Sequence, residues 1–198
     1  EGGAEFWARH AEALQRAEQV YGVPPQIVTA IIGVETRYGT HQGKYRIIDA
    51  LSTLAFDYPP RAKFFRSELE HYLLLTREEK LDPLVMMGSY AGAFGQPQFI
   101  SSSYRRYAID FDGDGHRDLW QNPTDAIGSV ANYLKENGWE RGGVVAVPAT
   151  ADGEAVASLL QDGLKPKRPW KELKKQGVAT EANVSADTPV ALVALEQA

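Results

Sequence analysis

The segment that most constrains this 198-residue chain is "DFDGDGHRD", residues 110–118, in which aspartates recur at every second position. Asp110, Asp112 and Asp114 take positions 1, 3 and 5 of an EF-hand-type loop, and Gly115 takes position 6, where such a loop turns sharply. Carboxylates packed this closely repel one another unless a cation lies between them. The pattern therefore predicts a loop that folds around a hard divalent cation, Ca²⁺ in preference to Mg²⁺.

The remaining ligands of this loop follow from its continuation. His116 at position 7 would offer its backbone carbonyl, and Asp118 falls at position 9. Position 12, ordinarily a bidentate glutamate, is Gln121, so a later carboxylate must close the site. Asp125, at the start of the next helix, is the best candidate, and the predicted EF-hand-like segment is 110–125. A solvated Asp-Gly turn without a cation is the alternative interpretation.

Helical periodicity dominates the first 141 residues. Apolar residues recur at helical spacing in four segments, which are 5–21, about 25–38, about 60–79 and about 124–137. Glycines that can end these helices follow three of them, at Gly22, Gly39 and Gly138. Thr124 or Asp125 is the expected N-cap of the last helix.

The character of the sequence changes after about Gly142. Residues 143–149 and 188–196 read as short strands, and two short helical pieces, 153–163 and 168–177, lie between them. We therefore predict a mainly α (α+β) fold, with a helical core at 1–141 and a small mixed α/β segment at 142–198.

Composition excludes several classes of function. The formal net charge is −5, the pI is near 5.4 and no run of Lys or Arg stands out, which argues against a nucleic-acid binder. The chain has no cysteine, so disulfides, thiolate catalysis and cysteine-based zinc sites are excluded. No apolar run approaches the ~20 residues of a transmembrane helix.

A carboxylate interrupts the apolar helix in "PPQIVTAIIGVETRYG". Three apolar residues share its face of the helix: Ile27, Ile31 and Val34. Glu35 is therefore expected at the edge of a buried stripe, where burial and the negative helix end would favour the protonated carboxyl group and Arg37 would oppose it. A glutamic acid that stays protonated near neutral pH can act as a general acid. A solvated glutamate paired with Arg37 or Arg46 is the alternative.

The segment "GSYAGAFGQPQF", residues 88–99, combines glycines with hydroxyl, amide and aromatic side chains. It lacks the Gly-Lys-Ser/Thr of a P-loop, and no strand precedes it as in a dinucleotide-binding motif. Glycines let the backbone approach a ligand closely. Ser89, Tyr90 and Gln98 supply hydrogen-bonding groups and Phe99 supplies a flat apolar surface. This mixture suits a glycan groove, although a plain loop is equally compatible with it.

Four motifs follow one another along the chain: "IIGVETRYG", "RIIDALSTLAFDYP", "GSYAGAFGQPQFISSSYRRYAIDFDGDGHRDLW" and "DAIGSVANYLKENGW". In this order they closely resemble the MltB family of bacterial lytic murein transglycosylases, over about residues 21–139. The part up to Ala198 resembles the smaller β-containing domain of that family more loosely. The resemblance implies a lysozyme-like helical core in the periplasm of a Gram-negative bacterium, attached to the outer membrane only through a lipid anchor absent from this sequence.

The resemblance also implies roles for individual residues. Glu35 matches the single catalytic glutamate of the family, in its Glu-Thr-x-x-Gly motif, and Ser89 and Gln98 match residues that line the groove. Three aromatic residues are further candidates for substrate binding: Tyr58, Tyr90 and Phe99. The calcium loop of the family matches five residues: Asp110, Asp112, Asp114, His116 and Asp125. Asp125 comes one residue later than in the family pattern, because "QNP" occupies the gap.

The implied substrate is the peptidoglycan strand, cleaved at the β-1,4 bond from N-acetylmuramic acid to N-acetylglucosamine. Glu35 would donate a proton to the glycosidic oxygen and then take the proton of the C6 hydroxyl, while the N-acetyl group of the substrate stabilises the charge at C1. The product would be a 1,6-anhydro sugar. The family usually continues into an aromatic-rich stretch with a Tyr-Asn pair that returns to the groove, and this sequence lacks it. Either the chain was cut or that stretch is supplied separately, so we expect an incomplete groove in these residues.

Two other functions remain compatible with the sequence. A lysozyme-type hydrolase on the same fold would need a second carboxylate about 5–9.5 Å from Glu35, and Asp57 is the residue that could supply it. A non-catalytic murein-binding module would bind the glycan without turnover, which an incomplete groove favours.

Overall fold

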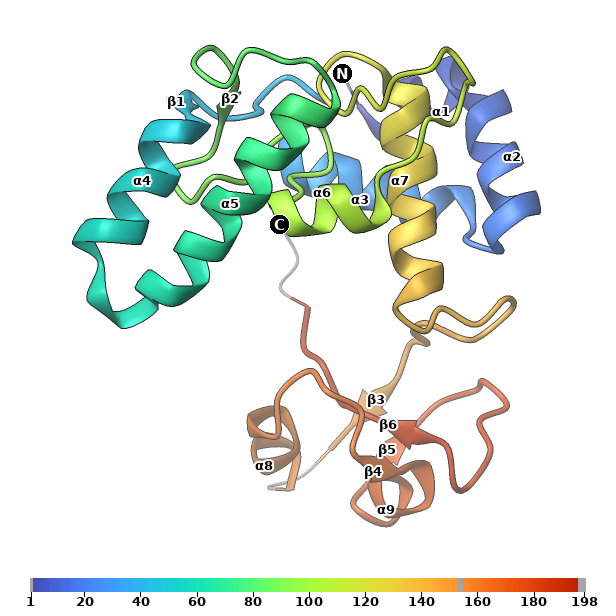
Figure 1. Ribbon diagram of the computed structural model, residues 1–198. Coiled ribbons are helices and arrows are strands. Elements are labelled where there is room, and N and C mark those ends of the chain that lie inside the picture. Colours follow the sequence, from blue (N-terminus) through green and yellow to red (C-terminus); the bar gives the residue numbers. More distant parts are fainter. Residues whose placement is uncertain (1, 153–154, 196–198) are drawn as a thin grey trace. The chain divides into compact units, whose positions relative to one another are not determined.

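The computed structural model describes residues 2–152 and 155–195. The chain divides into two compact units, Glu1–Gly143 and Val144–Ala198, which Figure 1 shows in blue to yellow and in orange to red. This division falls two residues beyond the predicted one, since residues 142 and 143 belong with the helical unit.

The first unit is built from helices. These are α1 (Gly3–Arg9), α2 (Ala11–Tyr21), α3 (Pro25–Thr36), α4 (Ile47–Asp57), α5 (Ala62–Glu78), α6 (Ser101–Tyr107) and α7 (Pro123–Glu136), with a 3₁₀ turn η1 at Pro59–Arg61. A two-residue ribbon accompanies them, in which β1 (Tyr45–Arg46) pairs antiparallel with β2 (Met87–Gly88). Next to this ribbon, Gly43 has φ 101°, and a Cβ at that position would overlap the backbone carbonyl of Gly88.

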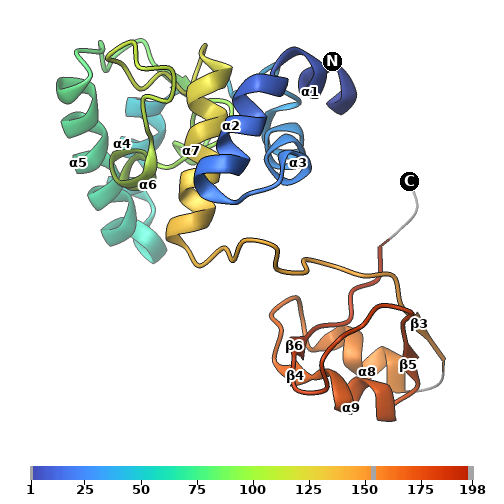
Figure 2. The same cartoon turned by 90° about the vertical axis from the view of Figure 1, so that its right-hand side faces the viewer.

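The helices bury two hydrophobic clusters. One lies among α4, α5 and α6 and includes Leu51 and Tyr72, while the other lies among α1, α2, α3 and α7 and includes Leu14 and Ile127. Figures 1 and 2 show α4 beside α5 and α2 beside α7, in agreement with their residue contacts. Burying each such side chain stabilises the fold by roughly 1.5–3 kcal/mol.

Several helix ends differ from the predicted ones. The predicted helix over 5–21 is broken at His10, whose φ of −115° separates α1 from α2. The helix expected to reach residue 38 ends at Thr36, because Arg37 and Tyr38 are left-handed, with φ of 47° and 59°. The N-cap of α7 is Asn122, whose side chain accepts a hydrogen bond from the Thr124 amide, and not Thr124 or Asp125 as predicted.

The second unit combines two short ribbons with two helices. β3 (Thr150–Ala151) pairs with β5 (Val178–Ala179), β4 (Arg168–Pro169) pairs with β6 (Pro189–Val190), and the helices are α8 (Ala155–Gln161) and α9 (Trp170–Lys175). Their core is formed by Leu159, Leu173 and Val178. Both predicted helical pieces are present, except that Gly153 and Glu154 lie outside the described residues.

The strands of this unit differ more from their predicted extents. The expected strand over 143–149 is irregular, and pairing begins only at Thr150. The one expected over 188–196 shortens to Pro189–Val190, and Glu196 lies outside the described residues. In the part of the chain that the structure describes, no helix is both long enough and apolar enough to span a bilayer.

Candidate active site and metal centre

The predicted buried face of α3 is wrong by one residue. Val28, Ile32 and Thr36 are buried, whereas Val34 is 84% exposed and Glu35 is exposed as well. Helix α3 packs on α1, α2 and α7 through this inner face, which ends in a threonine. The spacing of apolar residues does not predict which face of α3 is buried, because the buried Thr36 is polar and the exposed Val34 is apolar.

Glu35 therefore presents its carboxyl group to solvent. Within residues 2–152 and 155–195, no hydrogen bond or ion pair engages that carboxyl group. The suggested pairing with Arg46 is not formed, because Arg46 binds Asp49 at 2.6 Å. Glu35 is thus free to contact a ligand, but the partial burial predicted for it is not observed.

The turn that carries Gln98 is anchored to Thr36, the residue that follows Glu35. Phe94 and Phe99 exchange backbone hydrogen bonds of 2.9 and 3.0 Å, which closes the turn between them. The hydroxyl of Thr36 donates a hydrogen bond of 2.7 Å to the carbonyl oxygen of Gln96, inside this turn. The end of α3 and the second half of segment 88–99 are therefore neighbours, as expected if both contribute to one site.

Ser89 organises the first half of the same segment. Its Oγ accepts hydrogen bonds from the amides of Ala91 (3.3 Å) and Ala93 (3.0 Å), and its own amide donates to the carbonyl of Ala93 (2.7 Å). In the contacts with the Ala91 and Ala93 amides the hydroxyl oxygen of Ser89 is the acceptor, so the hydroxyl hydrogen stays available to a ligand.

Gln98 is held in an uncommon conformation. Its φ is 50°, in the left-handed region that non-glycine residues rarely adopt. Its Nε2 donates to the carbonyls of Gly95 (3.0 Å) and Gln42 (3.2 Å), so the side chain is fixed to both sides of the turn. Its amide oxygen accepts no hydrogen bond from the described residues and can serve a ligand.

The three aromatic candidates differ in accessibility. Tyr90 is 74% exposed and Tyr58, at the end of α4, is 43% exposed, so both can contact a ligand. Phe99 is only 7% exposed and packs against Tyr133 at 5.6 Å between ring centroids. Its ring stabilises the turn from the core side and offers almost no surface to a substrate.

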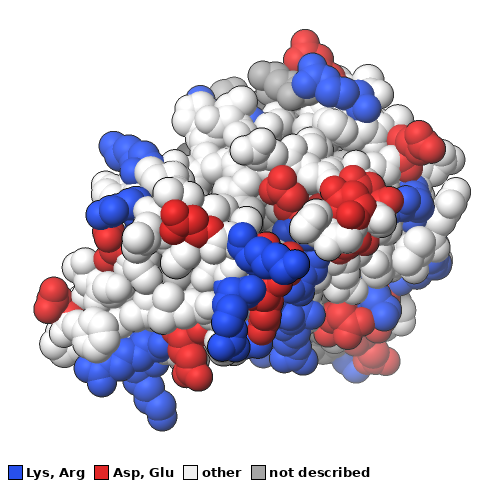
Figure 3. Space-filling model, turned by 45° about the horizontal axis from the view of Figure 1, so that its top comes forward, with Lys and Arg blue, Asp and Glu red and all other residues white. Residues whose placement is uncertain are grey.

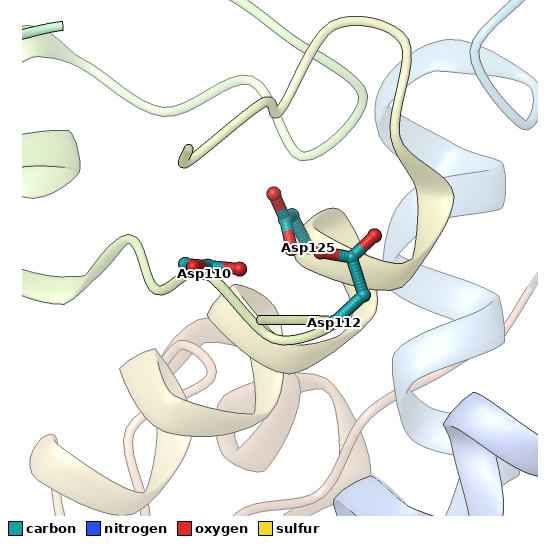
Figure 4. A group of neighbouring side chains, drawn as sticks. All are labelled: Asp110, Asp112 and Asp125. Carbon is teal, nitrogen blue, oxygen red and sulfur yellow. The ribbon is translucent and has the colours of Figure 1, made fainter. Parts of the chain in front are cut away.

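Three of the predicted metal ligands come together. Carboxylate oxygens of Asp110, Asp112 and Asp125 all lie within 4.8 Å of one another. Figure 4 shows two of these side chains on the loop and the third, Asp125, on the first turn of α7. Gly115 turns the loop with φ 94°, as position 6 of the pattern requires. The donor set of three carboxylates fits a hard divalent cation.

The other three predicted ligands, Asp114, His116 and Asp118, are placed differently. The carboxylate of Asp114 lies outside this triad and accepts a hydrogen bond of 2.8 Å from the amide of His116, which is itself exposed. Asp118 caps the next turn, accepting hydrogen bonds from the amides of Trp120 (2.8 Å) and Gln121 (2.9 Å).

The loop fastens itself to α7 through Asp125. The two oxygens of this buried carboxylate accept hydrogen bonds from the amides of Phe111 (2.7 Å) and Asp118 (2.8 Å), on opposite sides of the loop. Burial raises the pKa of Asp125, and these two amides act against it. In contrast, three backbone amides, that of Gly115 foremost, lower the pKa of Asp110.

Three residues of the site escape sequence analysis, namely Thr36, Gln42 and Gln96. The side chain of Gln42 donates to the carbonyls of Gly39 (3.0 Å) and Trp120 (2.8 Å), and Gln96 is 4% exposed. Each acts through partners distant in sequence, so no local pattern identifies it. Only Thr36 could have been noticed in the sequence, because it directly follows Glu35.

Known proteins resemble this chain over most of its length. The Transglycosylase SLT domain family matches residues 1–198. The chain is 50% identical to membrane-bound lytic murein transglycosylase B of Escherichia coli (strain K12) over 194 aligned residues. The aligned region covers 98% of this chain and 52% of that protein. It therefore spans about half the length of this curated relative.

Two solved structures show the same fold. Catenated lytic transglycosylase SltB1 from Pseudomonas aeruginosa is 53% identical with a TM-score of 0.90, over 96% of this chain and 62% of that one. Escherichia coli lytic transglycosylase Slt35 in complex with calcium is 50% identical with a TM-score of 0.89, over 96% of this chain and 60% of that one. These matches confirm the predicted helical, lysozyme-like fold class. Since the family match extends over all of its residues, the chain belongs to the Transglycosylase SLT domain family.

Proposed function

We propose that this chain cleaves peptidoglycan as a lytic transglycosylase, with Glu35 as its acid and base. The observation that carries this proposal is the solvent-exposed carboxyl group of Glu35 at the end of α3, whose last residue, Thr36, binds the turn of Gln98, in a chain of this family. The relative in Escherichia coli is named a lytic murein transglycosylase, which supports the same polymer as substrate.

The reaction uses one carboxyl group twice. Protonated Glu35 gives its proton to the oxygen of the β-1,4 bond between N-acetylmuramic acid and N-acetylglucosamine, and that bond breaks. The N-acetyl group of the substrate stabilises the positive charge at C1. The Glu35 carboxylate then removes the proton of the C6 hydroxyl, whose oxygen bonds to C1 and leaves a 1,6-anhydro end.

The neighbouring side chains suit the binding of a sugar. The hydrogen of the Ser89 hydroxyl and the amide oxygen of Gln98 offer one donor and one acceptor, as an N-acetyl group and hydroxyls require. Tyr90 and Tyr58 add exposed rings against which a sugar face can pack. Figure 3 shows uncharged areas between groups of acidic and basic side chains on one face.

A related complex supports the proposed product. The structure of SltB3 from Pseudomonas aeruginosa, 37% identical to this chain, is in complex with NAG-anhNAM-pentapeptide. A relative therefore accommodates an anhydro sugar. The chain would meet such strands in the periplasm, in keeping with the membrane-bound relative.

We further propose that the aspartate loop holds a structural Ca²⁺. Asp110, Asp112 and Asp125 would supply carboxylate oxygens, and Asp114 and the backbone carbonyl of His116 would complete the set as the loop adjusts. The ion would neutralise the triad and fasten the loop to α7. The calcium complex of the Slt35 relative supports this choice of metal.

Product analysis tests the enzymatic proposal. Purified murein is incubated with the wild-type chain, with Glu35→Gln and with Glu12→Gln, an exposed glutamate of α2 that serves as the matched control. We expect mass spectrometry to find anhydromuramyl ends with the wild type and Glu12→Gln, and none with Glu35→Gln. Reducing ends formed by water would identify a hydrolase instead. Glycan binding without any cleavage would identify a binding module.

A further inference from the structure

Thr36 connects the helix of Glu35 to the turn of Gln98. The residue is 1% exposed, and its Oγ1 lies 2.7 Å from the carbonyl oxygen of Gln96 and 3.3 Å from that of Ile32. A hydroxyl has one hydrogen to donate, and the shorter contact is the stronger one. The hydroxyl therefore bonds across to the turn, 60 residues further along the chain, in preference to its own helix.

The same hydroxyl also fixes the chain that follows it. Its oxygen accepts a hydrogen bond of 3.0 Å from the amide of Gly39, and the backbone carbonyl of Thr36 accepts one of 2.9 Å from the amide of His41. Between these contacts lie Arg37 and Tyr38, both left-handed. Such conformations persist where the surroundings fix them, and they gather at active sites.

A second set of hydrogen bonds also joins the chain after Thr36 to the turn of Gln98. The Nε2 of Gln98 donates to the carbonyl of Gln42 at 3.2 Å, and the Nε2 of Gln42 donates to the carbonyl of Gly39 at 3.0 Å. Gly39 is also the residue whose amide is bound by Thr36. The left-handed bend after Thr36 and the left-handed Gln98 are therefore held together by one network.

We propose that Thr36 is a positioning residue for the transglycosylase reaction. Its hydroxyl fixes the carboxyl group of Glu35 relative to the turn that presents Gln98, without touching the substrate itself. This inference rests on the proposed function of Glu35. A misplacement of about 1 Å at a reacting centre lowers the rate by as much as ~10²-fold, so a single anchoring hydrogen bond has a measurable effect.

The proposed positioning role of Thr36 depends on its hydroxyl group and not on the volume of its side chain. Thr36→Val keeps the shape of the residue and leaves the Gln96 carbonyl and the Gly39 amide without this partner. Thr36→Ser keeps the hydroxyl and removes a methyl group. A packing role would make serine the more damaging replacement, whereas a positioning role makes valine the more damaging one.

Kinetics on purified murein tests the proposal, with rates expressed per folded molecule well below the melting temperature. We expect Thr36→Val to lower kcat about tenfold or more with little change in KM, and Thr36→Ser to retain kcat within about threefold. Thr29→Val is the matched control on the same helix, because Thr29 is 6% exposed and its hydroxyl has no partner in the described chain. Thr76→Val controls for lost stability, because this buried hydroxyl bonds within α5, to the carbonyl of Leu73 at 3.2 Å.

The outcomes separate this inference from the proposed function. If Glu35→Gln abolishes the anhydro product while Thr36→Val keeps the wild-type kcat, Thr36 is not a positioning residue and the function stands. The positioning role is equally overturned if Thr36→Ser is as slow as Thr36→Val, or if Thr76→Val is equally slow. If the wild type and Glu35→Gln cannot be told apart, the proposed function fails and this inference fails with it.

Discussion

The carboxylate of Glu68 on α5 accepts two hydrogen bonds from Ser102 on α6, from its amide at 2.9 Å and its hydroxyl at 2.7 Å. The residue that precedes α6, Ile100, has no side chain that can cap the helix. Glu68 therefore satisfies an amide of the first turn of α6 from a neighbouring helix. Since Glu68 is only 4% exposed, these two bonds replace the water that its carboxylate has lost on folding.

Glu68→Gln is expected to destabilise the chain by about 1–3 kcal/mol, because an amide binds the Ser102 amide and hydroxyl less strongly than a carboxylate. The measurement is urea unfolding at neutral pH. Glu70→Gln, an exposed residue on the same helix, serves as the control and should be nearly neutral. Equal effects of the two substitutions would contradict the capping role of Glu68.

Gly128→Ala should destabilise the fold although alanine favours helices. A Cβ at Gly128, inside α7, would overlap the ring of Phe111. The gain in helix propensity is about 1 kcal/mol, whereas overpacking costs about 1–3 kcal/mol. Thermal unfolding of the two single variants and of the double variant with Phe111→Ala, which removes Cγ and the rest of the ring, measures the coupling. A double variant whose loss equals the sum of the two single losses would show that the two positions do not clash.

Calcium should raise the melting temperature, and Asp112→Asn should remove most of that rise. Asp112 is in the carboxylate triad and is exposed, so its loss affects the ion more than the metal-free fold. Asp82→Asn is the matched control, because Asp82 is exposed and caps a turn outside the loop, where it accepts a hydrogen bond of 2.8 Å from the amide of Leu84. At about 100 times its Kd, a bound ligand stabilises a protein by about 2.7 kcal/mol. A melting temperature that is the same with calcium and with chelator would refute the calcium site.

Alkaline pH should destabilise the chain through Tyr72. Burial raises the pKa of Tyr72 above its ordinary value of 10.0, and its hydroxyl donates to the carbonyl of Pro83 at 2.8 Å. The folded chain therefore holds this proton more tightly than the unfolded one. The resulting stability is complete below pH 10 and declines as pH rises toward the folded pKa.

Tyr72→Phe should cost about 1 kcal/mol at neutral pH and should flatten the decline in stability above pH 10. Urea midpoints at several pH values give both quantities. Tyr90→Phe, at a residue 74% exposed, should change neither. If the alkaline decline of Tyr72→Phe matched that of the wild type, other groups would be responsible for it.

The features that the sequence predicts well are those with local causes. The aspartates at every second position, with Gly115 at the turn, define the loop, and Asp125 joins Asp110 and Asp112 as predicted. The helices with proline at the start and a strong apolar period, α3, α5 and α7, appear within a few residues of their predicted bounds. Asp114 differs from the pattern, because its side chain serves a local hydrogen bond instead.

What the sequence does not reveal depends on contacts between distant residues. The inner face of α3 includes Thr36 because a carbonyl 60 residues away accepts its hydroxyl hydrogen. Gln42 has a role only because Gly39, Gln98 and Trp120 meet around it. Phe99 resembles a ligand surface by composition, yet tertiary packing against Tyr133 buries it.

The close approach of Gly43 to Gly88 has a consequence for the exchange of segments between relatives of this chain. Neither position admits a side chain, and the ribbon of β1 and β2 begins directly beside them. The far end of the glycine-rich segment is fixed in turn by Gln98 and Gln42. Residues 89–97 are thus tied at both ends, and Phe94 and Gln96 between these ends are buried, so an exchange of this segment between relatives should preserve the fold only if these anchoring residues are kept.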